Sequence, residues 1–287
     1  MISPKWRLVG VVPMSFFTKS LTSALLIAAV TSLPIAARAG VGDLLVAPTR
    51  IVLDGRRGTE IILNNVGNEP ATYRVSVEFR RMTAEGRLED VTEPSAAEKL
   101  AEEMIVYAPR RVTLAPRQPQ SIRISARPPQ GIADGEYRVH LLFRAIPPAK
   151  PVSARTAEAP KGVSFSLTPV YGVTIPVIVR LGQLQAQAGI ANVQLGSDEG
   201  KPVVSMDVSR KGERSTFGEI RVLKAGVKDP IAVAKSIAVY TEVGQRAVSV
   251  PISEDFKGDI RGPVTVQYLE TYDDGARTIA ETSVVLR

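Results

Sequence analysis

Side chains able to do acid–base or metal chemistry are few in this chain. It has one histidine, His140, and no cysteine. Metal sites and nucleophiles built from cysteine are therefore excluded, and no Gly-x-Ser-x-Gly motif or glycine-rich phosphate loop accompanies His140. The acidic pair Asp273 and Asp274 precedes Gly275, a pattern typical of a turn. The composition predicts a protein that is not an enzyme and needs no cofactor.

The pattern that stands out instead lies in residues 163–180, VSFSLTPVYGVTIPVIVR. Its odd positions are all apolar, and most of its even positions are small, polar or charged, as in a strand with one buried face. Unbroken, it would run about 60 Å, roughly three times a common strand. Pro169 and Pro176 lack the amide hydrogen that a central strand uses, so they favour a sheet edge. An apolar edge of this kind indicates pairing with another chain.

Residues 1–39 predict a cleaved export signal. Basic residues precede an apolar run at 21–37, and Ala37-Arg38-Ala39 is the small-x-small pattern of a cleavage site. The run is too short and interrupted for an ordinary span, so we expect no stable membrane insertion; an uncleaved anchor is the alternative. Without the four basic residues of this segment the formal charge falls from +7 to +3. A net charge of this size gives no general reason to expect nucleic-acid binding.

Short alternating segments separated by turns predict an all-β fold. Ser95 and Glu98 form a capping box that predicts one helix over 96–104. Residues 147–162 carry proline, alanine and charge without an apolar period, which indicates a mobile loop. This loop precedes the alternating segment 163–180, which is called the ribbon below. Within residues 40–181 we expect strands at 44–53, 59–64, 72–80, 112–114, 121–126, 135–146 and 163–180.

Residues 182–287 alternate again and contain no helix of ordinary length. We expect strands at 191–195, 203–209, 218–222, 237–241, 246–250, 262–271 and 278–286. A chain of this size without disulfides must be stabilised by burial, most simply in two domains. We therefore expect two β-sandwich domains, 40–181 and 182–287.

Several stretches carry a family resemblance: Ala47-Pro48-Thr49-Arg50, Asn64-Asn65-x-Gly67, Tyr107-Ala108-Pro109-Arg110, Leu114-Ala115-Pro116, Gln120-Ser121-Ile122-Arg123, Asp134-Gly135-Glu136-Tyr137-Arg138, Phe143-Arg144-Ala145-Ile146-Pro147, and the ribbon ending in Arg180. In order and spacing they resemble the PapD-like periplasmic chaperones of pilus and fimbria assembly. The resemblance implies two immunoglobulin-like β-sandwich domains in an L-shaped arrangement, and a periplasmic location.

Such chaperones lend an edge strand to a pilus subunit that lacks one, cap its reactive edges and deliver it to an outer-membrane usher. The resemblance implies the same function and partners here. The donor side chains would be Val163, Phe165, Leu167 and Tyr171, with packing in the chain's own core as the alternative. The odd positions of 175–179 are expected to be core.

The resemblance also implies an anchor and a domain lock. Arg50 matches the arginine that binds the subunit's terminal carboxylate, a task suited to the guanidinium fork; a surface ion pair is the alternative. The family's second anchor, a lysine, falls at Pro176. Glu136 and Arg180 match an interdomain salt bridge, whose third member would be one of Glu270, Asp273 and Asp274.

A second function stays open, that of an exported structural, surface or pilus component with immunoglobulin-like domains. Against it, the first expected strand begins within a few residues of Gly40, which leaves no N-terminal segment for donation.

Overall fold

The computed structural model describes residues 43–147, 170–272 and 275–287. In these ranges the chain is mostly β-strand, with a single helix, α1 (Ala96–Met104). The all-β, two-domain fold class expected from the sequence is confirmed. The export signal, most of the 147–162 loop and the first part of the ribbon lie outside the described residues.

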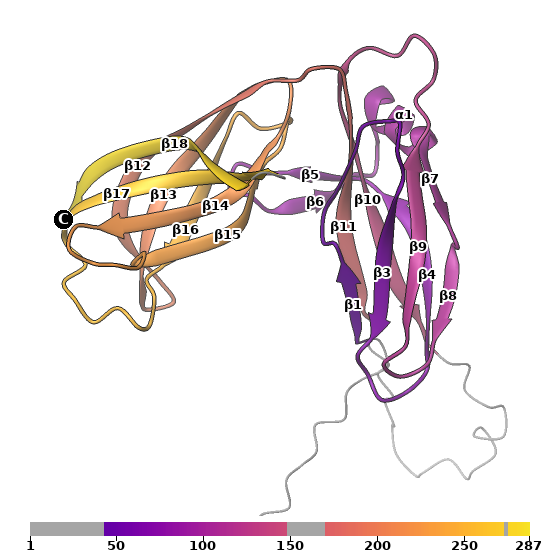
Figure 1. Ribbon diagram of the computed structural model, residues 1–287, viewed down its shortest axis with the longest axis horizontal. Coiled ribbons are helices and arrows are strands. Elements are labelled where there is room, and N and C mark those ends of the chain that lie inside the picture. The colour runs from indigo at the N-terminus through magenta and orange to yellow at the C-terminus, as the bar shows by residue number, and fades with distance from the viewer. Residues whose placement is uncertain (1–42, 148–169, 273–274) are drawn as a thin grey trace, which may run out of the picture. The chain divides into compact units, whose positions relative to one another are not determined.

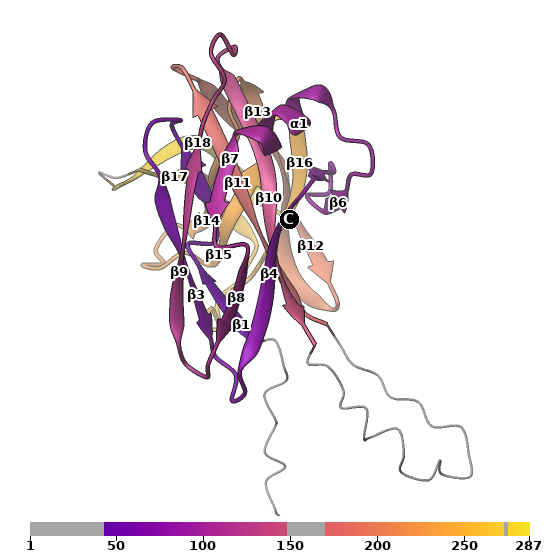
Figure 2. The same ribbon diagram turned by 90° about the vertical axis from the view of Figure 1, so that its right-hand side faces the viewer.

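The first sandwich consists of two sheets (Figure 1). One has the strand order β1 (Leu44–Ala47), β3 (Thr59–Asn65), β9 (Pro119–Ala126), β7 (Ile105–Ala108). The other has the order β2 (Ile51–Leu53), β11 (Gly172–Leu181), β10 (Gly135–Ile146), β4 (Ala71–Glu78), β8 (Arg111–Leu114). Helix α1 lies at one end of this sandwich, beside β7 (Figures 1 and 2).

The second sandwich also has two sheets. One contains β12 (Ala186–Asp198), β13 (Lys201–Gly212) and β16 (Gln245–Pro251). The other has the order β15 (Ala232–Val239), β14 (Thr216–Lys224), β17 (Gly262–Tyr272), β18 (Gly275–Leu286). The sheets of the first sandwich thus end at Leu181, and those of the second begin at Ala186. A separate hairpin is formed by β5 (Arg80–Met82) and β6 (Leu88–Asp90).

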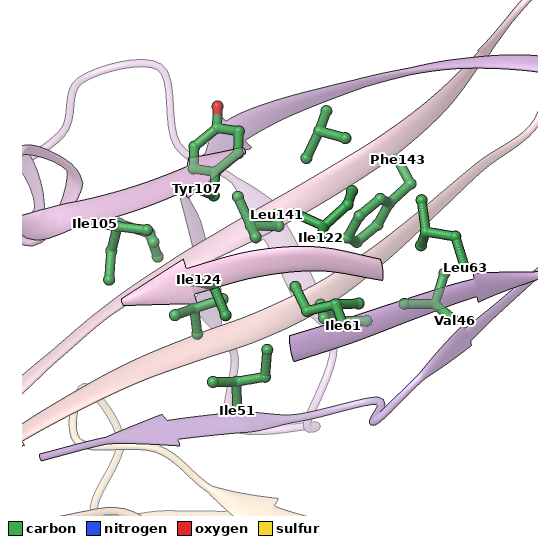
Figure 3. Close-up of a cluster of buried hydrophobic side chains, with 14 of the residues drawn as sticks. Val46, Ile51, Ile61, Leu63, Ile105, Tyr107, Ile122, Ile124, Leu141 and Phe143 are labelled. Carbon is green, nitrogen blue, oxygen red and sulfur yellow. The ribbon is translucent and has the colours of Figure 1, made fainter. Parts of the chain in front are cut away.

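The inward side chains of the first sandwich form one continuous core. Figure 3 shows Ile61, Ile122 and Leu141, from three different strands, meeting between the sheets; all three are fully buried. Burying a side chain of this size contributes on the order of 1.5–3 kcal/mol. Three residues of the ribbon belong to the same core, at the odd positions expected: Ile175, Val177 and Val179.

The largest departure from the expected strands is near the N-terminus. The segment 44–53 was predicted as one strand, but β1 pairs with β3 in one sheet and β2 pairs with β11 in the other. The chain crosses between the sheets at Pro48–Arg50, where Pro48 has no amide hydrogen to continue a ladder. This crossing places Arg50 between the sheets' edges.

Two further differences concern short strands. β7 was not predicted. It follows α1 without a loop, so its short alternating pattern could not be distinguished from the end of the helical pattern. The predicted strand 72–80 ends at Glu78, and β5 and β6 form a hairpin around the polar turn at 84–86. The strands expected in the second sandwich are present, and most extend further than expected. The strand expected at 237–241 instead runs from Ala232 to Val239.

Candidate anion-binding cleft beside an open strand edge

One edge of β11 is partly open. β10 pairs with β11 from Gly172 to Leu181, whereas on the other side β2 pairs only with Val177–Val179. In the part of the chain that the structure describes, the backbone of residues 172–176 therefore has no partner strand on this side. Unpaired N–H and C=O groups along an edge are a template for a further strand.

The expected donor side chains lie at or before this edge. Tyr171 directly precedes β11, and its carbonyl accepts a hydrogen bond from the Ala145 amide at 2.9 Å. Tyr171 is 54% exposed. Val170 is also exposed. The other three expected donors, Val163, Phe165 and Leu167, lie outside the described residues.

Arg50 lies one residue before β2, at the end of the open edge. Its guanidinium carbon is 4.6 Å from the centroid of the Phe217 ring. The Nε and Nη2 atoms are buried, and no hydrogen-bond partner is found for them among the described residues. Burial lowers the pKa of Arg50, and the nearby charge of Arg180 lowers it further. Because arginine stays protonated in proteins, this is a buried cation with unused donors, which suits an anion.

A cleft of about 590 Å³ opens at Arg50. Other residues that line it are Arg180, Arg214, Phe217, Glu270 and Tyr272. Both sandwiches thus contribute to its walls.

Glu136 and Arg180 form an ion pair, with Arg180 Nε donating to Glu136 Oε2 at 2.9 Å. The carboxylate is fully buried and also accepts bonds at 3.0 Å from the amide and the hydroxyl of Ser215. Arg180 in turn donates to the Ser215 carbonyl at 2.9 Å. The direct partner from the second sandwich is therefore a serine and not a carboxylate.

Glu270 lies in the same cleft but pairs with Arg214. The two Nη atoms of Arg214 donate to its two carboxylate oxygens at 2.8 and 2.9 Å. Burial opposes ionisation of Glu270, but the hydrogen bonds from Arg214 and Tyr272 outweigh it and lower its pKa. Asp273 and Asp274, the other candidates for the third member, lie outside the described residues.

The charges around the cleft do not cancel. Arg180 is matched by Glu136 and Arg214 by Glu270, which leaves the charge of Arg50 without a counterion. Pro176, where the family resemblance places a second cation, is opposite His140 and contributes no charge. The cleft can accept one negative charge.

Sequence reasoning missed several residues of this region. Ser215, Arg214 and Phe217 belong to the second sandwich and carry no motif that points to the cleft. Tyr272 could have been found, because it is two residues from Glu270 in β17 and so lies on the same face.

A second set of contacts joins the β5–β6 hairpin to the second sandwich. Glu242 accepts bonds from the Met82 amide at 2.7 Å and from Arg138 Nη1 at 3.0 Å. The Arg138 guanidinium also stacks 3.8 Å from the ring centroid of Tyr240. An apolar cluster of Met82, Ile178, Ala238 and Tyr240 lies beside these bonds.

Neither a metal site nor a membrane-spanning helix is present in the described part of the chain. Within residues 43–147, 170–272 and 275–287, no three histidine, cysteine, aspartate or glutamate side chains are grouped so as to hold a metal ion. The one helix of the described chain is not long and apolar enough to cross a membrane.

Comparison with known proteins gives similarity of structure only. No family model matches the sequence, and no curated protein matches it. The Escherichia coli chaperone DraB is 16% identical, over 85% of this chain and 96% of that chain, with a TM-score of 0.42. The Pseudomonas aeruginosa CupB2 chaperone is 13% identical, over 85% of this chain and 100% of that chain, with a TM-score of 0.41.

A structure of the Salmonella enterica SafA pilin in complex with the SafB chaperone contains a chain that is 16% identical, over 85% of this chain and 96% of that chain, with a TM-score of 0.41. All three structures contain a chaperone. Identities and TM-scores this low leave the function to be argued from the residues of this chain.

Proposed function

We propose that this protein is a periplasmic chaperone that binds the C-terminal strand of pilus subunits. The observation that carries the proposal is Arg50, whose buried guanidinium has two donors without partners at the end of an open strand edge. A chain terminus is the ligand that needs both features, because it brings a backbone to pair and a carboxylate to bind.

The geometry defines how such a strand would run. Arg50 is level with Pro176, since the next residue, Ile51, is opposite Val177. A strand added ahead of β2 and ending at Arg50 therefore runs parallel to β11 beside residues 172–176. Its terminal carboxylate accepts two bonds from Arg50 and supplies the one negative charge that the cleft lacks.

The donor side chains act from the other end of the ribbon. Val163, Phe165, Leu167 and Tyr171 would fill the groove that a missing strand leaves in the subunit. Each large side chain so buried contributes on the order of 1.5–3 kcal/mol before the cost of ordering the segment. The exposed side chain of Tyr171 is available for this role.

Because Pro176 takes the place of the second cation, we expect the carboxylate of the bound strand to accept its direct hydrogen bonds from Arg50. Arg180 adds a second positive charge nearby, and its Nε and Nη2 atoms are engaged with Glu136 and Ser215. We further propose export by the N-terminal signal, delivery of subunits to an outer-membrane usher, and action without catalysis or cofactor. These parts rest on the family resemblance of the sequence motifs.

Co-expression with candidate subunits tests the proposal. Arg50→Gln removes the charge but keeps a side chain of similar length, and we expect recovery of co-purified subunit to fall roughly tenfold or more, as for loss of a charged hydrogen bond. Leu167→Glu should have a similar effect through the donor strand. Arg123→Gln is the matched control, because the Arg123 side chain is 88% exposed on a different strand, β9.

Circular dichroism would show that each variant is folded. Equal subunit recovery with wild type, Arg50→Gln and Leu167→Glu would refute the proposed mechanism. A Leu167→Glu variant that fails to fold would instead assign Leu167 to the protein's own core.

A further inference from the structure

Three arginines stand in one row across the outer face of the sheet that contains β11. The register pairs Arg111 of β8 with Arg74 of β4, and Arg74 with Arg144 of β10. The row continues to Gly172, which is opposite Arg144 at the start of the open edge of β11. Adjacent strands are about 4.8 Å apart, so the three charges span roughly 10 Å.

These charges are not neutralised by the protein. All three arginines are exposed, and no hydrogen bond or ion pair of their side chains is found in the described part of the chain. The neighbouring rows on this face contain Thr72, Thr113 and Ile146 on one side and Ser76, Leu142 and Thr174 on the other. Like charges directly opposite one another destabilise a sheet, so the row lowers the stability of the free protein.

Gly172 leaves the row open toward the edge. It is exposed and has no side chain, and a Cβ atom built there would lie 2.9 Å from Leu142 Cδ1. A residue of a strand added beside Gly172 would be two strand spacings, about 10 Å, from Arg144. The end of the Leu142 side chain borders this space, and an arginine and a glutamate side chain together reach far enough to meet across Gly172.

We infer that the arginine row selects bound strands that carry an acidic residue opposite Gly172. The inference rests on the proposed function, because it requires a strand on the open edge of β11. The register defines this position. If the last residue of a parallel strand is opposite Pro176, the residue four positions earlier is opposite Gly172. Arg144 would pair with that carboxylate across the glycine, and Arg74 and Arg111 would add attraction from further along the row.

Ten-residue peptides of alternating valine and threonine, with a free C-terminal carboxylate and an N-terminal fluorophore, provide the probe. One glutamate is moved along the peptide, each time against a glutamine peptide, and binding to the whole exported chain is followed by fluorescence anisotropy. We expect glutamate at the fourth position before the last to bind roughly two- to fivefold tighter than glutamine, the range of an exposed ion pair. Neighbouring positions should show no preference, because their side chains point to the opposite face.

Two variants distinguish the effect of the Arg144 charge from the effect of the open space over Gly172. Arg144→Gln should abolish the preference, while Gly172→Val should abolish it with all three arginines intact, because its side chain stands between the partners. Arg87→Gln is the control, since Arg87 is exposed and lies outside the row. The preference should also weaken when the salt concentration is raised from about 50 to 300 mM.

The possible failures are distinguishable. If the glutamine peptides bind through Arg50 but glutamate gives no preference at the fourth position, the inference is wrong and the proposed function stands. If no peptide binds, or binding is unchanged in Arg50→Gln, both are wrong. If phosphatidylglycerol vesicles bind and release on Arg74→Gln and Arg144→Gln, the row is a membrane-binding surface, which also overturns the inference.

Discussion

At the scale of single residues, His140 shows the effect of burial on a titratable group. It is 1% exposed, and neither ring nitrogen has a hydrogen-bond partner among the described residues. Burial lowers the pKa of His140 to about 3, with the charges of Arg138 and Arg80 acting in the same direction. The folded protein therefore holds a neutral imidazole at pH values where the unfolded chain, with a pKa near 6.5, binds a proton.

This difference predicts acid sensitivity between about pH 6.5 and 3. In that window the unfolded state binds more protons than the folded state, so stability is lost as the pH falls. We expect the free energy of unfolding of the wild type to drop between pH 7 and pH 5 by on the order of 1–2 kcal/mol more than that of His140→Leu. Urea unfolding of both proteins at the two pH values measures this. Parallel losses in the two proteins would show that His140 does not titrate in this window.

At the scale of elements, one carboxylate joins helix α1 to the β5–β6 hairpin. The Ser95 hydroxyl accepts a bond from the Glu98 amide at 3.3 Å, and the Glu98 carboxylate accepts one from the Ser95 amide at 2.7 Å. Arg81 of β5 donates two further bonds to the same carboxylate. The bonds from Arg81 lower the pKa of Glu98 to about 2, against the opposing effect of burial.

Glu98→Gln therefore should destabilise the protein at neutral pH. We expect a loss of about 1 kcal/mol, since the capping box keeps its serine and the ion pair is partly exposed. The folded pKa is lowered, so the contribution of the carboxylate is present above about pH 4.5 and fades toward pH 2. Thermal unfolding should show the difference between wild type and variant at pH 7 and a smaller one at pH 3. A difference that is independent of pH would assign the effect to packing.

At the scale of the whole molecule, the contacts between the sandwiches are mainly charged and directional. Glu136, Arg180 and Ser215 form one set, and Glu242, Arg138 and the Met82 amide form another. Buried charges of this kind add little net stability because desolvation offsets their attraction, but removing one partner leaves the other unpaired. We therefore propose that their role is to define one docked arrangement.

Glu136→Gln tests this role. Glutamine preserves shape but leaves Arg180 without a counterion, and we expect unfolding to require about 3–5 kcal/mol less. Calorimetry should also show separated transitions of the two sandwiches. The double variant Glu136→Gln/Arg180→Gln should recover part of the loss. Glu85→Gln, at an exposed acid, is the matched control. A loss no larger than that of the control would show that the pair does not join the domains.

Much of the fold could be predicted from the sequence because its signals are local. Alternation defined most strands to within a few residues, and the pattern Ser95-x-x-Glu98 defined α1. The ribbon's apolar odd positions identified Ile175, Val177 and Val179 as core. These patterns are readable because burial on one face of a strand or helix imposes its period directly on the chain.

Only the tertiary structure decided what the charged residues contact. That Ser215 binds Glu136, that Glu270 pairs with Arg214, and that Arg50 has no counterion could not be read from spacing. The arginine row is similar: Arg74, Arg111 and Arg144 are far apart in sequence and become neighbours through strand register. Local periodicity determines which face a residue occupies, whereas its partner across the molecule depends on how whole sheets pair and pack.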